Sequence, residues 1–136
     1  MQFNLTHSLR TFLEQQTGIK TVWVYDGITL PADRPLLTIE QMTNINENIS
    51  KERTISTTYQ YQVGLYASSI RERSLKQNEV RGILMRGKIP LLNAQTPGET
   101  LGYFYALVTN EVPITPEDIS NKSQYHRVYF DVEVQL

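Results

Sequence analysis

Residues 55–68 alternate almost without interruption between two kinds of side chain. The odd positions of this segment carry mainly apolar or aromatic residues, and the even positions carry mainly polar ones. Because successive side chains of a β-strand point to opposite faces of a sheet, the pattern predicts one long strand with a buried face and a hydrated face. Residues 127–136 repeat the pattern, with an apolar residue at every even position. Two long two-faced strands in a small chain favour a protein whose surfaces meet other proteins.

Two other segments have the spacing of amphipathic helices. Near the N-terminus, apolar residues at i, i+4, i+7 and i+8 form one stripe: Leu5, Leu9, Phe12 and Leu13. Gly18 stands where a left-handed residue ends a helix. Ser69 and Glu72 form a capping box that starts a second helix, which we expect to run to about Arg86 with Gly87 as its stop. The second half of that helix is predicted to be the better buried half, because it carries most of the apolar side: Val80, Ile83 and Leu84.

A hairpin and shorter elements complete the chain. Residues 36–45 also alternate, and the polar stretch 46–53 that joins them to residues 55–68 predicts an extended antiparallel hairpin. We further expect three short strands and one helical turn: residues 21–25, 88–92, 102–112 and 115–118. The whole chain, residues 1–136, is therefore predicted to be a single α+β domain, with a mostly antiparallel twisted sheet, a long β-hairpin and two helices packed on one face.

Few groups in the sequence are arranged for chemistry. The chain has 136 residues, a net charge of −1 and no cysteine, which excludes disulfides and thiolate metal sites. His7 and His126 each lack a second ligand at metal-binding spacing, and no phosphate-binding loop or nucleophile motif is present. We therefore predict no catalytic, cofactor-binding or metal-binding residues, and we expect the chain not to be an enzyme. No apolar run reaches the roughly 20 residues of a membrane helix, so we expect no membrane partner.

Basic residues gather on and just after the second predicted helix: Arg71, Arg73, Lys76, Arg81, Arg86 and Lys88. Contact with nucleic acid is one interpretation of this cluster. The other is a solvated helix with some ion pairs between subunits, which we favour because at ~100° per residue these side chains spread around most of the helix. We expect no sequence-specific nucleic-acid partner.

The tip of the predicted hairpin is the candidate interaction site. A long arm that extends past a small core cannot bury both of its faces against that core, so apolar residues near its end would be partly exposed unless a partner covers them. The candidate interface residues are Ile45, Glu47, Ile49, Lys51, Glu52 and Arg53. An ordinary mobile loop is the alternative interpretation. Tyrosines predicted to be exposed on the polar strand faces also suit an interface: Tyr66 and Tyr129.

The order of these features resembles that of the tail terminator (head–tail joining, or neck) proteins of long-tailed bacteriophages. The resemblance begins with the opening helix, where residues 13–20 lead into the first strand, and continues with Arg34-Pro35 before an apolar strand. It extends through the long strand 58–67 that runs into a charged helix, and ends with the aromatic and arginine residues before the final alternating strand, residues 125–134. It covers nearly the whole chain as a pattern.

The resemblance implies an α+β virion structural protein that forms a ring, expected to be a hexamer. Its partners would be further copies of itself, the tail tube protein and the head connector protein, and its location would be the head–tail junction, with the host cytoplasm during assembly. The family has no catalytic residues to carry over. Another head–tail connector component, a stopper or tail-completion protein, is the nearest alternative. A small α+β ligand-binding domain or enzyme, and a nucleic-acid module, are less favoured.

Overall fold

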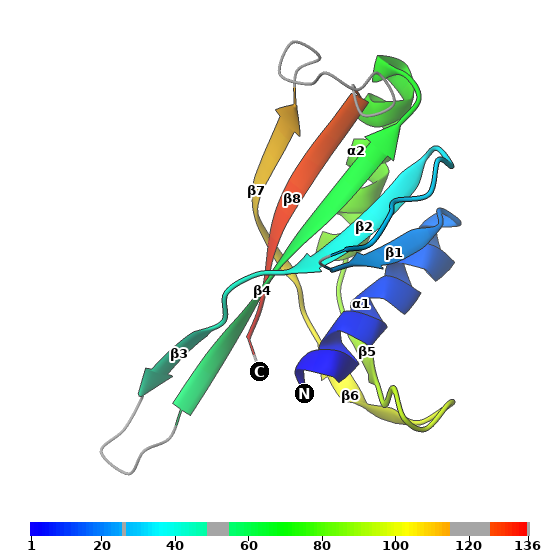
Figure 1. Cartoon of the computed structure of the whole chain (residues 1–136). Coiled ribbons are helices and arrows are strands. Elements are labelled where there is room, and N and C mark those ends of the chain that lie inside the picture. The colour runs from blue at the N-terminus through cyan, green and yellow to red at the C-terminus, as the bar shows by residue number, and fades with distance from the viewer. Residues whose placement is uncertain (26, 49–54, 115–125, 136) are drawn as a thin grey trace.

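A computed structural model describes residues 1–25, 27–48, 55–114 and 126–135 (Figure 1). Two helices, α1 (Gln2–Thr17) and α2 (Ile70–Met85), accompany these strands: β1 (Thr21–Val24), β2 (Leu36–Gln41), β3 (Ile45–Asn48), β4 (Ile55–Ala67), β5 (Ile89–Leu92), β6 (Thr100–Phe104), β7 (Leu107–Ile114) and β8 (His126–Gln135). The mixture of helices with a mainly antiparallel sheet confirms the predicted α+β class.

The long alternating strand β4 forms the centre of the large sheet. The sheet has the order β1-β2-β4-β8-β7, and β3 pairs with the remaining length of β4. β4 and β8, the two strands predicted from their alternation, pair with each other over ten residues, from Thr58 opposite Gln135 to Ala67 opposite His126. β1 is parallel to β2 and every other described pair is antiparallel, including the separate two-stranded sheet of β5 and β6.

Both helices lie on one face of this sheet, as the sequence predicts (Figure 1). α1 packs against β1, β2 and β5, and α2 packs against β4, β7 and β8. The core contains the odd positions of β4 from Tyr61 to Leu65 and the even positions of β8 from Val128 to Val134, together with α1 residues Leu5, Leu9 and Leu13. From α2 it contains only residues of the second half, which confirms that this half is the better buried: Val80, Ile83 and Leu84.

The predicted helix ends are confirmed in their local geometry. Ser69 Oγ accepts a hydrogen bond from the backbone N–H of Glu72 at 3.1 Å, and the Glu72 carboxylate accepts the N–H of Ser68 at 2.8 Å. At the end of α1, Gly18 has a φ of 71° and donates its N–H to the carbonyl oxygen of Glu14. Glycine adopts this left-handed conformation without the steric cost that a side chain brings.

The predicted strand over residues 36–45 is two strands separated by a bulge. Gln41 lies opposite Tyr61 and Ile45 opposite Thr58, so three residues of one chain segment face two of the other. The Met42 N–H still bonds the Gln60 carbonyl at 2.8 Å. Because an extra residue shifts the alternation by one, Ile45 lies on the face opposite to that of the core residue Ile39, contrary to the prediction that the two share a face.

The predicted strand over residues 102–112 is also two strands, and they belong to different sheets. Phe104 is the last residue paired with β5, and Leu107 is the first paired with β8. The in–out alternation continues across the junction, since Phe104 and Ala106 are both buried, and for this reason the sequence pattern does not reveal the change of partner. The predicted helical turn over residues 115–118 lies outside the described residues.

Candidate protein-interaction surfaces

The candidate chemical groups of the chain remain apart in the fold. His7 lies on α1 and His126 at the start of β8. Among the described residues, no three His, Cys, Asp or Glu side chains are placed to hold a metal ion. The helices of the described ranges also include none that is long and apolar enough to span a membrane.

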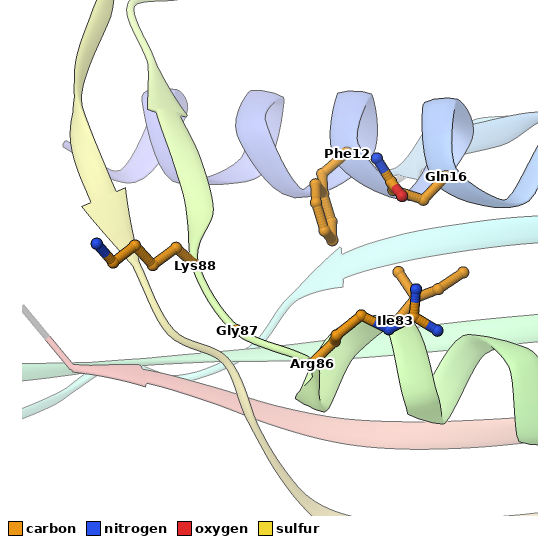
Figure 2. Close-up of a pocket in the computed structure, with 6 residues that line it drawn as sticks. All are labelled: Phe12, Gln16, Ile83, Arg86, Gly87 and Lys88. Atoms are coloured by element: carbon orange, nitrogen blue, oxygen red, sulfur yellow. The ribbon is translucent and has the colours of Figure 1, made fainter.

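One pocket lies between the ends of the two helices (Figure 2). It has a volume of about 240 Å³, and Phe12 of α1 and Ile83 of α2 point into it from opposite sides. Gln16, Arg86 and the backbone at Gly87 complete the lining, while the Lys88 ammonium points away from the helices and lies 5.6 Å from the ring centre of Tyr103. None of the described residues that line this pocket carries a carboxylate, hydroxyl or imidazole group, so these residues provide packing and positive charge without an acid–base pair.

The predicted arm is present in the described residues. β3 and the first part of β4 extend beyond the helices, away from the rest of the molecule (Figure 1). Two of the six candidate interface residues fall here: Ile45 is 42% exposed and Glu47 is exposed. The other four, Ile49, Lys51, Glu52 and Arg53, lie outside the described residues. The role of the arm as an interface stays a prediction.

The face of the large sheet that the helices do not cover, called the open face below, has an aromatic end. The prediction that Tyr66 and Tyr129 are exposed there is wrong: Tyr66 is only 6% exposed and Tyr129 is half-buried. The two rings meet edge to face, and their hydroxyl oxygens are 3.1 Å apart. Arg34 lies over the Tyr66 ring, and Arg127 donates to the Tyr129 hydroxyl at 2.8 Å. Burial, followed by the hydrogen bond with Tyr66, raises the pKa of Tyr129.

Gly64 of β4 makes this aromatic packing possible. A Cβ at this position would lie 3.1 Å from the Tyr129 ring and still closer to the Thr38 hydroxyl. The absence of a side chain leaves space for the ring to lie across the central strand. The burial of both tyrosines therefore depends on a contact between residues far apart in the sequence, which the alternation of polar and apolar residues does not indicate.

The other end of the open face is acidic. Cross-strand pairing places Glu40, Asp131 and Glu133 on this face, and Glu47 of β3 follows them along the arm. The described residues of these strands include no lysine or arginine at this end, and these four carboxylates make no ion pair with a described residue. Glu133 accepts one hydrogen bond from Gln60 at 3.2 Å. The carboxylates thus present uncompensated negative charge.

An exposed apolar row, which the sequence interpretation missed, adjoins this acidic end. Its members are alternate residues of β6, β7 and the junction between them, each 46–62% exposed: Leu101, Tyr103, Tyr105 and Leu107. Leu107 lies opposite Glu133 on the sheet, and a shallow pocket of about 320 Å³ separates it from Thr58 and Gln135. The sequence does contain a sign of this row: residues 100–108 carry apolar side chains on both faces of the segment, and only one of these faces can lie in the core.

The basic cluster of α2 divides into paired and unpaired members. Arg81 forms an ion pair with Glu111 of β7 at 2.8 Å, and Lys76 pairs with Glu79 at 3.2 Å. Arg71 and Arg86 are exposed, and neither makes an ion pair with a described residue. These guanidinium groups are therefore available to an external partner.

No protein-family model matches the chain, and no curated protein sequence matches it significantly. The resemblance to tail terminator proteins rests on the order of sequence features alone.

Proposed function

We propose that this chain is a virion structural protein of the tail terminator type, which forms a ring on the end of a phage tail tube and joins the tail to the head connector. The observation that carries the proposal is the exposed apolar row Leu101–Tyr103–Tyr105–Leu107 beside a projecting arm. Contiguous apolar side chains on a folded surface mark sites that another protein covers.

The mechanism would be geometric. A ring of identical subunits needs two different surfaces on each copy, because every subunit contacts one neighbour with one surface and the other neighbour with the second. The two ends of such a ring differ, so one end can stop the growth of the tube and the other can receive the head. The arm and the apolar row supply contacts of this kind without any reactive group.

The first experiment measures mass. Native mass spectrometry and sedimentation of the purified chain, alone and with tail tubes of the phage that encodes it, should detect a closed ring bound to tube ends. A chain that stays monomeric at all concentrations and does not bind tubes would refute the proposal.

A paired substitution tests the apolar row. Tyr105→Glu places a charge within the row and should reduce ring formation or tube binding severalfold, since the buried charge would lack a partner. Tyr25→Glu is the matched control, because Tyr25 is equally exposed, at 62%, but lies after β1 at the opposite edge of the sheet. Equal effects of the two substitutions would remove the row from the proposal.

A phage that lacks the gene separates the proposed function from that of another connector component. Loss of a tail terminator should give overlong tails, because nothing stops the tube from growing. Loss of a stopper should instead give heads that leak their DNA, with tails of normal length. Electron microscopy of the defective particles measures both quantities directly.

A further inference from the structure

One face of α2 combines positive charge with exposed apolar groups. At ~100° per residue, its exposed positions fall on a single stripe that contains Arg71, Leu75, Gly82, Met85 and Arg86. Leu75 is 60% and Met85 is 55% exposed. Glu72 lies to the side of the stripe, and Glu79 lies at its edge, where Lys76 neutralises it in an ion pair at 3.2 Å.

No contact among the described residues explains the glycine at position 82 of this stripe. A glycine inside a helix costs about 1 kcal/mol relative to alanine. A Cβ added at Gly82 would meet nothing within 4 Å, so the position is not kept small by any described contact. A missing side chain between two exposed apolar residues leaves a flat place where another surface can approach the helix closely.

The acidic end of the open sheet face has the complementary composition. Its exposed apolar residues include Ile45 and Leu107, with Met42 also exposed beside Gln60 and Asp131. Glu47 lies two residues beyond Ile45 on the same face, and Glu133 lies beside Leu107 on the next strand. Between Ile45 and Leu107 lie Thr58 and other polar side chains of β4 and β8. The helix stripe and this sheet surface thus each place two apolar groups near two charges of one sign.

The spacing of the two surfaces agrees. Leu75 and Met85 lie roughly 15 Å apart along the helix, at about 1.5 Å per residue. Leu107 and Ile45 are separated by three strand spacings across the sheet and two residues along it. At spacings of about 4.8 Å and 3.3 Å, that separation is roughly 16 Å.

We propose that the α2 stripe of one copy docks on the acidic end of the open face of a second copy. Leu75 then faces Ile45, Met85 faces Leu107, and the arginines Arg71 and Arg86 face Glu47 and Glu133. The two surfaces differ and lie on opposite sides of the sheet, so repetition of the contact builds a ring or a filament instead of ending at a dimer. The inference rests on the self-association in the proposed function and not on attachment to a tail.

Charge reversal with rescue tests the contact. Glu133→Lys and Arg86→Glu should each weaken self-association roughly tenfold or more, because each places like charges together. The double variant restores an opposite pair at every contact of the assembly and should recover most of the affinity. Glu47→Lys with Arg71→Glu forms an independent second set. Native mass spectrometry at several protein concentrations measures the assembled fraction, and thermal unfolding confirms that each variant is folded.

Asp33→Lys and Lys20→Glu are the matched controls. These two residues form an exposed ion pair away from both surfaces, and their reversal changes the net charge by the same amount. Assembly that resists all four interface reversals would overturn the proposed contact and leave a ring built in another way. A wild-type chain that is monomeric at every concentration would also overturn the contact. To refute the tail function, the chain would in addition have to fail to bind tubes.

Engineered cysteines give a second, covalent test. The native chain has no cysteine, so Leu75→Cys with Ile45→Cys supplies the only thiols. Under mild oxidation the double variant should form a ladder of linked dimers, trimers and larger species on denaturing gels. Each single variant should form no species beyond a dimer, because a chain with one thiol cannot link two neighbours. A double variant without a ladder would contradict the pairing of these two positions.

Discussion

The two ends of the open sheet face belong to the same strands but differ in whether their polar groups have partners within the chain. At the aromatic end, the Tyr66 and Tyr129 hydroxyl groups bond each other, and Arg127 bonds Tyr129. At the acidic end, Glu40 and Asp131 face outward without a described cation beside them. Groups whose partners lie within the chain contribute to its stability, whereas unpaired like charges oppose folding slightly and remain available to another molecule. Substitutions at the two ends should therefore separate stability from association.

Gly64→Val should have the largest effect on stability. Its side chain would collide with the Thr38 hydroxyl and the Tyr129 ring, so the aromatic end would have to open. We expect a loss of about 3 kcal/mol in the free energy of unfolding, at the upper range for overpacking. Urea denaturation measures it. Gly82→Ala, where the added methyl group meets nothing, should instead stabilise the isolated chain by about 0.5–1 kcal/mol. Equal losses at both glycines would show that the aromatic packing is not the reason for Gly64.

Alkaline pH should reveal a buried tyrosine on the other face of the sheet. Burial raises the pKa of Tyr61 to about 12 from a usual value of 10, although Thr6 and Gln2 donate hydrogen bonds to its hydroxyl group. The unfolded chain therefore loses this proton first. Stability from Tyr61 is complete below pH 10 and falls as the pH rises toward 12, by about 2–3 kcal/mol at 1.36 kcal/mol per pKa unit.

Urea denaturation between pH 9 and pH 12 measures this loss, with Tyr61→Phe as the comparison. The variant should be less dependent on pH in this window, because it has no proton to lose at that position. Part of the dependence should remain, since the pKa of Tyr129 is also raised. An unchanged slope in Tyr61→Phe would contradict the burial of this hydroxyl group in solution.

Tyr129→Phe should have a smaller effect on the free energy of unfolding, because it removes only one oxygen atom. The substitution keeps the ring but removes the hydrogen-bond partner of Tyr66 and Arg127. We expect a destabilisation of about 1 kcal/mol by urea denaturation, the usual net value of a hydrogen bond. Tyr103→Phe, on the exposed apolar row, should change the free energy of unfolding by about 0.3 kcal/mol or less, within the range of surface substitutions. A loss at Tyr103 as large as that at Tyr129 would remove the difference between the two positions.

Asp131→Asn at the acidic end should have the smallest effect on stability. Its carboxylate makes no ion pair with a described residue, and Glu40 and Glu133 lie on the same face nearby. Removing one of several like charges should therefore leave the free energy of unfolding unchanged or raise it by about 0.2–0.5 kcal/mol, most visibly at low salt. A destabilisation above 1 kcal/mol would mean that this end, too, is organised for the fold.

The sequence predicted those parts of the fold that depend on local patterns. The alternation of β4 and β8 placed their core residues correctly, and the ends of both helices followed from Gly18 and the Ser69–Glu72 capping box. The burial of Tyr66 could not be predicted in this way, because it depends on Arg34, Gly64 and Tyr129, which come together only in the folded sheet.

The candidate site was predicted in part for a similar reason. A long hairpin implied a projecting arm, and Ile45 and Glu47 are exposed on it. The apolar row is not evident from the sequence, because the alternation over residues 102–112 predicts one strand of one sheet, whereas Leu107 begins a new pairing. The alternation of polar and apolar residues predicts which side chains share one side of a strand. Which of the two sides another molecule can reach depends on the strands that pair with it.

The extra residue between β2 and β3 acts as a phase change in the alternation of the arm. The residues of β3, beginning with Ile45, present the opposite side from the one they would present in a continuous strand. Asn44 ties this point to α1, since its amide donates to the Gln2 side chain at 2.7 Å. A single-codon deletion here would exchange the two sides that β3 presents, while β4 keeps its pairing with β8. The set of side chains that the arm offers to another molecule could therefore change in one genetic step.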